Sequence, residues 1–335
     1  MYYSDTDHVT VISPTTAAHY EEGDVRAGVR LGVDIISAAS VDLVSAASPT
    51  GYHEERHEAE TTVGYEAGRG TWIDGTYDIS IEPDFETQRL SGAASHEFLN
   101  RSLTLALDYT YTTSQFGRRT AGPLGQSRTG HGVEASASAV LSGRLVLDVL
   151  YGFDGSFGDL ANPYREVKLY APGAEAHSTA VPEAVPDTRI RQIATVRLRA
   201  NPLTSLFTQA TYRLYADTWG VLAHTVLLRA TEMLWGDTIG LTVEARGYKQ
   251  DAADFYRARY ETFPQAPRRR TADKELGPLY TGRAGLHVEY SPPVTFTEAL
   301  RFGLGGDVLY MRYLDYAFLN ARTAALLTFD LTWEL

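Results

Sequence analysis

Apolar and polar residues alternate along most of this chain with a period of two. In residues 102–112, SLTLALDYTYT, leucine and tyrosine occupy the odd positions, while serine, threonine and aspartate occupy nearly all the even ones. A β-strand turns successive side chains to opposite faces, so this pattern predicts a strand with one apolar and one polar face. A helix would scatter the same residues around its circumference. Residues 144–154, RLVLDVLYGFD, repeat the pattern.

Segments of this kind recur from one end of the chain to the other. They lie near 7–20, 24–37, 52–66, 71–82, 85–98, 102–115, 129–141, 144–156, 188–200, 204–217, 219–232, 237–250, 278–290, 299–313 and 321–335. Most are long enough to cross a bilayer at a tilt, which takes about 9 to 11 residues per strand. Short links alternate with longer ones, which lie at 38–51, 116–128, 157–187, 251–277 and 314–320. This alternation is typical of outer-membrane barrels, which have short periplasmic turns and longer extracellular loops.

The fold class is therefore predicted as all-β, a transmembrane antiparallel β-barrel that occupies residues 1–335 as a single domain. We expect about 16 strands, with about 14 as the alternative. The predicted first and last strands both run toward the periplasm, so an even number requires one more strand, in MYYSDT or upstream of residue 7. The segments 157–187 and 251–277 are expected to be long loops, either external or folded inward.

Composition narrows the setting of this barrel. The 21 tyrosines and the absence of cysteine suit aromatic girdles and passage through an oxidising compartment. Without cysteine there are no thiolate zinc sites, iron–sulfur clusters or thiol catalysis, and the net charge of -12 argues against nucleic-acid binding. No apolar run is long enough for a membrane-spanning helix. The start, MYYSDTDH, has neither a basic region nor an apolar run, so we expect a mature or recombinant form without a signal peptide.

One motif indicates a different class of protein. Residues 53–58, HEERHE, contain the His-Glu-x-x-His pattern of zinc proteases, which places two imidazoles on one face of a helix. Here the motif leads directly into alternating residues that predict a strand. On a strand, His53 and His57 would lie about 13 Å apart, at roughly 3.3 Å per residue, and Glu54 would point to the opposite side. One ion cannot be bound that way, so we expect no metal and no cofactor.

The C-terminal residues, ALLTFDLTWEL, carry the most specific single signal. Their apolar face resembles the C-terminal signature by which the barrel-folding machinery of the outer membrane recognises its substrates. That signature usually ends in an aromatic residue, whereas here the last aromatic residue lies two positions before the end. The face comprises Leu327, Phe329, Leu331, Trp333 and Leu335. The alternative is an ordinary amphipathic strand that happens to be the last one.

Residues near the N-terminus carry a family resemblance. The run at 41–51, VDLVSAASPTG, resembles an acidic strand end followed by Ser-Gly-Ala-Ser-Pro-Thr-Gly, with Ala46 where glycine is more frequent. That pattern belongs to a bacterial family catalogued only as a domain of unknown function. The opening YYSDTDHVTVISP also looks like the start of that family's domain. The resemblance implies an outer-membrane β-barrel and implies no substrate, because the family has no established activity.

The polar faces of the strands divide by charge. Acidic residues predominate on the third to eighth predicted strands, and arginines on the ninth to fourteenth. The acidic set is Glu54, Glu58, Glu60, Asp74, Asp78, Glu97, Asp108, Glu134, Asp148 and Asp154, with Arg56, Arg89 and Arg144 among them. The basic set is Arg189, Arg191, Arg197, Arg199, Arg213, Arg229, Arg246, Arg283 and Arg301, with Glu244, Glu289 and Asp307 among them. If the apolar faces meet lipid, both sets line the lumen, where opposed charges would orient polar solutes and set ionic selectivity.

These features predict a porin-like channel of the bacterial outer membrane that passes small polar or charged solutes and is not an enzyme. A barrel of about 16 strands leaves an aqueous channel unless something plugs it. The charges could instead pair across the interior and fill it. The alternative function is then a closed structural or partner-binding barrel that uses its external loops to bind an unknown periplasmic or extracellular protein.

Two further possibilities concern the predicted external rim. A rim enzyme would draw on His8, His53 and His57 together with the nearby aspartates Asp5, Asp7 and Asp42. The expected surroundings are outer-membrane lipid and lipopolysaccharide. Lipopolysaccharide phosphates would meet the basic run at 268–270, RRR, within the 251–277 loop. The alternative for this run is an ordinary exposed basic loop.

Overall fold

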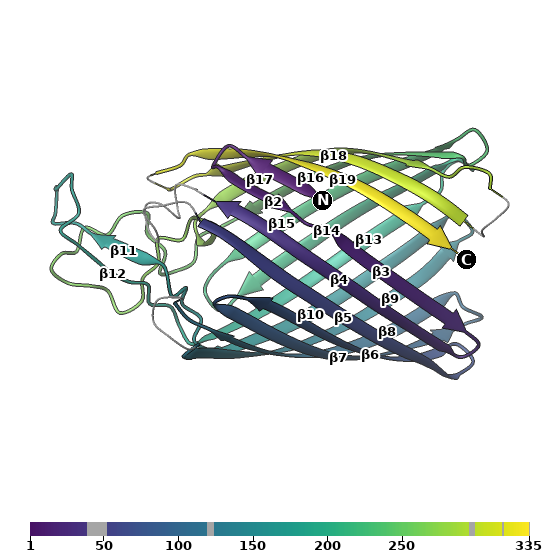
Figure 1. Cartoon of the computed structure of the whole chain (residues 1–335), viewed down its shortest axis with the longest axis horizontal. Coiled ribbons are helices and arrows are strands. Elements are labelled where there is room, and N and C mark those ends of the chain that lie inside the picture. The colour runs from purple at the N-terminus through teal and green to yellow at the C-terminus, as the bar shows by residue number, and fades with distance from the viewer. Residues whose placement is uncertain (39–51, 119–123, 295–298, 317, 335) are drawn as a thin grey trace.

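The wall of the protein is a single β-sheet that closes on itself (Figure 1). The computed structural model describes residues 1–38, 52–118, 124–294, 299–316 and 318–334. Its elements are β1 (Tyr2–Asp5), β2 (Val9–Ile12), β3 (Thr15–Glu22), β4 (Val25–Ala38), β5 (Tyr52–Gly68), β6 (Thr71–Glu82), β7 (Phe85–Phe98), β8 (Leu103–Phe116), β9 (Gln126–Ser142), β10 (Leu145–Gly158), β11 (Glu166–Leu169), β12 (Thr179–Pro182), β13 (Thr188–Ala200), β14 (Leu206–Asp217), β15 (Leu222–Leu234), β16 (Ile239–Gln250), the short helix η3 (Lys274–Leu276), β17 (Leu279–Tyr290), β18 (Ala299–Tyr313) and β19 (Ala321–Glu334). Neighbouring strands of the wall are antiparallel, and β1 closes the sheet by pairing with both β2 and β19.

The barrel has sixteen wall strands. Its sheet contains 17 segments, but β2 and β3 pair with successive parts of β4 and form one strand that is interrupted at Pro14. Proline interrupts a ladder because it has no backbone N–H to donate. The expected sixteen strands are therefore confirmed, and the alternative of fourteen is wrong. The additional strand sought in MYYSDT is β1, which has 4 residues and pairs with residues 324–327 of β19.

The outer face of the wall is apolar. In β8, Leu105, Leu107 and Tyr109 are exposed by 43%, 55% and 47%, although they belong to the apolar face of the strand. Comparable exposed apolar side chains occur on strands all around the barrel. A continuous exposed apolar surface of this extent marks contact with lipid. The predicted transmembrane barrel is thus confirmed by the direction in which its side chains point.

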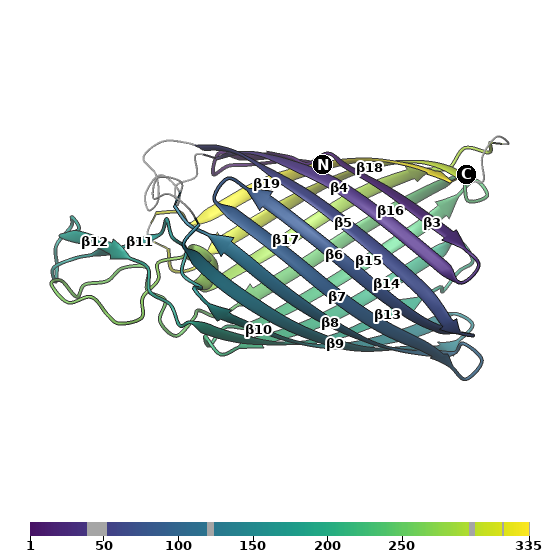
Figure 2. The same ribbon diagram turned by 60° about the horizontal axis from the view of Figure 1, so that its bottom comes forward.

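The two ends of the barrel differ. At one end, the turn end, short connections join β3 to β4, β5 to β6 and β7 to β8. At the other, the loop end, long segments join β10 to β13 and β16 to β17, and the hairpin β11–β12 extends beyond the wall (Figures 1 and 2). Exposed tryptophans, Trp235 and Trp333, lie at the turn end, where aromatic side chains commonly meet the membrane interface.

Close-packed apolar residues are concentrated at the loop end. One cluster joins Trp219 and Val221 to Ala253 and Tyr256, and a second is centred on residues of β17 and β18. A third, formed by Val167, Leu169 and Tyr260, ties the hairpin β11–β12 to the segment that follows β16. The loops therefore have cores of their own. None of the helices in the described ranges is long and apolar enough to span a membrane.

Two motifs of the sequence lie on strands of this wall. The HEERHE run lies within β5, so it is part of a strand, as expected. The C-terminal alternating face lies on β19, where Leu327, Phe329, Leu331 and Trp333 are exposed by 54% to 68%. Leu335 and the run at 41–51 lie outside the described residues.

Candidate functional site

The inner face of the wall is a network of ion pairs between strands. Seven of the nine arginines of the predicted basic wall have carboxylate partners on the same or neighbouring strands. The pairs are Arg189 with Asp217, Arg191 with Asp154, Arg197 and Arg199 with Asp148, Arg229 with Glu244, Arg283 with Glu244 and Asp307, and Arg301 with Glu334. Arg246 stacks on Tyr248, and Arg213 makes no hydrogen bond or ion pair within the described ranges. Most of these charges are thus neutralised along the wall.

The acidic set is arranged in the same way. Asp74 accepts two hydrogen bonds from Arg26, Glu60 pairs with Arg30, and Glu58 lies 3.3 Å from Arg56. Asp148 binds arginines of β13 and Ser138, whereas the Asp108 carboxylate accepts only from Thr110 among the residues that the structure describes. Asp78 and Glu134 make no hydrogen bond or ion pair with any residue the structure describes. Pairing therefore runs along the wall, between residues close in register, and not from wall to wall.

A glycine makes room for one of these pairs. Arg26 on β4 reaches Asp74 on β6 across β5, with an Nε–Oδ1 distance of 2.7 Å. The residue between them is Gly64, where a Cβ atom would lie 2.3 Å from the Asp74 Oδ1. Any larger residue would therefore displace the carboxylate. This strand glycine serves the close approach of two side chains.

Pairing does not bury these inner-face arginines. The side chains of Arg199 and Arg229 are exposed by 50% and 48%, although both are ion-paired. Arg199 lies next to the turn end of β13, and Arg229 lies nearer the middle of β15. Both guanidinium groups are therefore accessible to solvent.

At the loop end lies a cavity of about 1020 Å³, which we call the vestibule. Its wall is formed by the loop-end parts of β5, β6, β7, β8, β9, β10 and β13. Its outer side is formed by residues 160–165, 183 and 185, and by Asp273 and Leu276, all from the two long loops. The vestibule is thus bounded by the barrel on one side and by the bases of the loops on the other.

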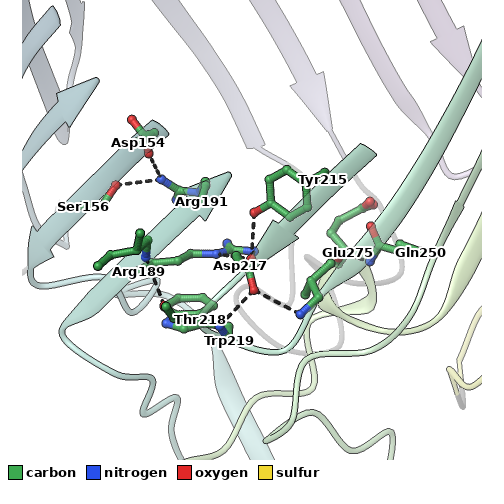
Figure 3. A network of polar contacts seen from close by, with 12 residues as sticks. Asp154, Ser156, Arg189, Arg191, Tyr215, Asp217, Thr218, Trp219, Gln250 and Glu275 are labelled. Atoms are coloured by element: carbon green, nitrogen blue, oxygen red, sulfur yellow. Dashed lines mark hydrogen bonds and ion pairs between the residues drawn. The ribbon is translucent and has the colours of Figure 1, made fainter. Parts of the chain in front are cut away.

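A buried aspartate organises the wall of the vestibule (Figure 3). The Asp217 side chain is fully buried and accepts hydrogen bonds from Arg189 Nε at 2.8 Å and from the Tyr215 hydroxyl at 2.7 Å. Its other oxygen accepts from the backbone N–H groups of Trp219 and Val221. The Arg189 guanidinium also stacks on the Trp219 ring, 4.3 Å from its centroid. These contacts fix both the β14–β15 turn and the direction of Arg189.

The vestibule is bipolar. Arg89, Arg128, Arg189 and Arg191 line it from β7, β9 and β13. Glu54, Glu82 and Asp84 line it from β5 and the end of β6, with carboxylate oxygens within 4.8 Å of one another. The Tyr164 hydroxyl, from the first long loop, donates to Asp84. Basic and acidic groups therefore line different parts of one cavity.

The two long loops hold each other over the vestibule. Arg165 pairs with Asp273, and the Thr271 hydroxyl donates to Glu183. The backbones of Ala184 and Arg270 exchange two hydrogen bonds, of 3.1 and 2.7 Å. Contacts between the loops thus involve charged side chains, a hydroxyl and the backbone.

The second long loop also contacts the β1–β2 turn and β19. The Lys274 ammonium lies 3.3 Å from the Asp7 carboxylate in the β1–β2 turn, and their side chains are 5% and 0% exposed. Arg322 of β19 binds Asp5 and lies 3.8 Å from Glu275. The loop therefore spans from β16 to the first strands.

Proton binding at Glu183 is expected to tighten the loop contacts. Burial raises the pKa of the Glu183 carboxyl above the ordinary glutamate value, despite a hydrogen bond from Thr271 and the nearby Arg165. The packed loops therefore favour protonated Glu183. Their stability should be greatest below the ordinary carboxyl pKa and should decline as pH rises through the raised one.

This expectation can be measured by amide hydrogen exchange of Ala184 and Arg270, after correction for the intrinsic exchange rate. Protection should fall as pH rises in the wild type and should depend less on pH in Glu183→Gln, where the pKa of Glu275, also raised by burial, still contributes. Equal pH dependence in both proteins would show that another group is responsible.

Two aspartates of the predicted rim site, Asp5 and Asp7, make structural contacts. Asp5 accepts from the backbone N–H groups of Asp7 and Val9, and Asp7 is buried against Lys274. His8 lies in the turn with φ 60°. Asp42 lies outside the described residues. The rim aspartates are thus used to hold the β1–β2 turn and the loop above it.

Comparison with protein families matches residues 115–304 to a family described as a protein of unknown function, DUF3570. The chain belongs to this family. The predicted membership of a family known only as a domain of unknown function is thereby confirmed, although the run at 41–51 lies outside the matched range. No curated protein sequence matches the chain significantly.

Solved structures share the fold. A bacterial polysaccharide outer membrane secretin has a TM-score of 0.53 and 11% identity, covering 100% of this chain and 96% of that one. The siderophore receptor PirA from Pseudomonas aeruginosa has a TM-score of 0.50 and 10% identity, covering 99% and 60% respectively. At such identities the likeness shows the fold alone, which is the barrel of outer-membrane proteins.

Proposed function

We propose that the protein is a passive channel of the bacterial outer membrane for small polar or charged solutes. The observation that carries the proposal is the half-exposed state of paired arginines on the inner face, because such exposure is expected of a water-filled lumen. Solutes would pass from the vestibule through the lumen to the turn end.

The membrane placement rests on the two surfaces of the wall. The apolar outer face is suited to hydrocarbon, and the sheet closes on itself where β1 pairs with β2 and β19. By the usual asymmetry of such barrels, the turn end would face the periplasm and the loop end the exterior. The vestibule would then be the external entrance.

The size and lining of the lumen favour permeation. Barrels of about 16 strands leave an aqueous channel unless a segment plugs it. Ion pairs between adjacent strands, such as Arg229 with Glu244, keep the charges at the wall, so they do not need to meet in the centre. The charges of Arg213 and Glu134, which have no ion-pair partner among the described residues, would contribute to the ionic selectivity of the channel.

One observation favours a second candidate, a partner-binding barrel. The long loops have a packed core and carry the hairpin β11–β12 beyond the wall, which suits an interaction surface. In that case the lumen would not transmit solutes, and the loops would bind an extracellular protein.

Swelling of proteoliposomes separates the two candidates. The refolded protein is reconstituted and diluted into isotonic solutions of glycine, arabinose or a trisaccharide. A channel predicts swelling with rates that fall as solute size increases. A folded protein, verified by heat-modifiable migration, that causes no swelling with glycine would contradict the channel.

A further inference from the structure

We propose that the basic side of the vestibule is a binding site for a small organic carboxylate, centred on Arg128 and Arg191. The proposal deepens the proposed function, since it takes the vestibule as the entrance for solutes and names their charge. Three observations support it. Arg128 has no carboxylate partner within the described ranges, hydroxyl groups lie beside it, and Gly130 and Gly132 leave space next to it on the inner face, which we call the notch.

Arg128 is held in place without being neutralised. Its guanidinium carbon lies 5.1 Å from the Phe85 ring centroid and 5.4 Å from that of Phe116, and the two rings are 5.7 Å apart. Such contacts orient a cation and leave its charge in place. Within the described ranges, the Arg128 side chain makes no hydrogen bond and no ion pair. Its donors are therefore available to a ligand.

The strand register surrounds Arg128 with donors. Ser114 of β8 stands opposite Arg128, and the inward-facing residues one step deeper are Thr112 and Ser156. Arg191 lies on β13 and donates to Ser156 at 2.8 Å while it pairs with Asp154. A carboxylate near Arg128 would meet a second guanidinium and several hydroxyl groups, which is the environment that such an anion requires.

Two glycines keep the site open. Gly130 and Gly132 follow Arg128 on the inner face of β9, at the positions where other strands carry Thr112, Ser156 or Asp154. A Cβ atom at Gly130 would be 3.5 Å from its nearest neighbour, an ordinary contact. The glycine is therefore not needed for packing of the wall, and its effect is to leave space in the cavity.

The charges on the basic side of the vestibule favour a negative group. Arg191 is paired with Asp154, whereas the side chains of Arg128 and Arg89 have no ion pair with any residue that the structure describes. The acidic residues Glu54, Glu82 and Asp84 line another part of the cavity. Since the partly exposed Phe85 ring lines the site, an organic anion would place its carbon skeleton against apolar surface, which an inorganic anion cannot use.

Isothermal titration calorimetry of the folded full chain in a nonionic detergent tests this site, at low ionic strength. The probes are succinate, inorganic phosphate and tetramethylammonium. The proposal predicts saturable binding of succinate, weaker binding of phosphate and none of tetramethylammonium. Arg128→Gln should weaken succinate binding at least tenfold. Gly130→Leu, which fills the notch and keeps every arginine, should abolish it.

Arg301→Gln is the matched control, because it removes an inner-face arginine at the turn end and should leave binding unchanged. Binding that survives in both Arg128→Gln and Gly130→Leu would overturn the site, as would a folded wild type that binds neither anion. Phosphate bound more tightly than succinate would overturn the assignment to an organic ligand. Since binding in detergent needs no permeation, a site that binds in a barrel that does not conduct would refute the channel alone.

Discussion

Replacing Arg191, Arg197 and Arg199 together by glutamine is expected to shift the permeability ratio of the barrel toward cations by roughly fivefold. A unit charge about 10 Å from the permeating ion contributes about 0.4 kcal/mol in water. Screening at 0.1 M salt reduces this to about 0.15 kcal/mol. Three charges, acting in opposite senses on cations and anions, then give about 0.9 kcal/mol, which is the stated ratio.

The structure gives this substitution a second effect in the same direction. The three arginines neutralise Asp154 and Asp148, so their removal also exposes two carboxylates to the lumen. Adding Asp148→Asn and Asp154→Asn should therefore restore much of the original selectivity. The measurement is the reversal potential in a tenfold gradient of potassium chloride.

A control variant removes three positive charges at positions outside the wall. Arg69, Arg268 and Arg269 are exposed residues of a turn and of a long loop, and their joint replacement by glutamine removes three charges from outside the wall. This variant should change the reversal potential much less. An unchanged potential in the conducting inner-face variant would refute the assignment of those arginines to the lumen.

Lys274→Met is expected to destabilise the packing of the second long loop by about 3 to 5 kcal/mol, the usual cost of removing one partner from a buried ion pair. Lys274 is 5% exposed and lies against Asp7, which is fully buried. The substitution would leave the aspartate buried without its lysine. Opening of the loop should become about a hundredfold to a few thousandfold more frequent.

Amide exchange in the loop measures this change. The N–H groups of Ala253, Leu276 and Gly277 are bonded within the loop and should lose protection, whereas amides of the central wall strands should not. The double substitution Asp7→Asn with Lys274→Met removes both charges and should recover a large part of the loss. Full protection in Lys274→Met would contradict the prediction, because it would mean that the apolar contacts of the loop keep it closed without the ion pair.

Periodicity predicted the wall because a membrane barrel has one lipid face and one polar face on every strand. The run SLTLALDYTYT became β8 with its leucines and tyrosines outward. The short hairpin β11–β12 was not predicted, since its strands have 4 residues each and lie in a loop. Four residues are too few to establish a period.

The pairing of charges could not be predicted from the same pattern. The alternation places Arg229 and Glu244 on the same face, but only the register of β15 and β16 puts them opposite each other. Register depends on turn geometry and packing around the whole barrel. The sequence therefore predicted which strands carry acidic and basic residues, but not which of these residues form short pairs along the wall.

Arg128 was missed for a related reason. The alternation was recognised from residue 129, so the sequence placed Arg128 in the link 116–128, whereas β9 begins at Gln126. Strand ends are hard to locate because the rim is polar on both faces. The arginine between two phenylalanines of neighbouring strands was the signal available, and it becomes visible only once β7, β8 and β9 are aligned.

Single-channel recording in a planar bilayer tests the central claim most directly. The refolded protein, shown to be β-structured by circular dichroism and heat-modifiable in gel migration, is inserted at 1 M potassium chloride. A water-filled lumen predicts stable, stepwise currents of uniform size that scale with salt concentration. Verified insertion without any current would contradict an open lumen and would leave the packed loops as the functional surface.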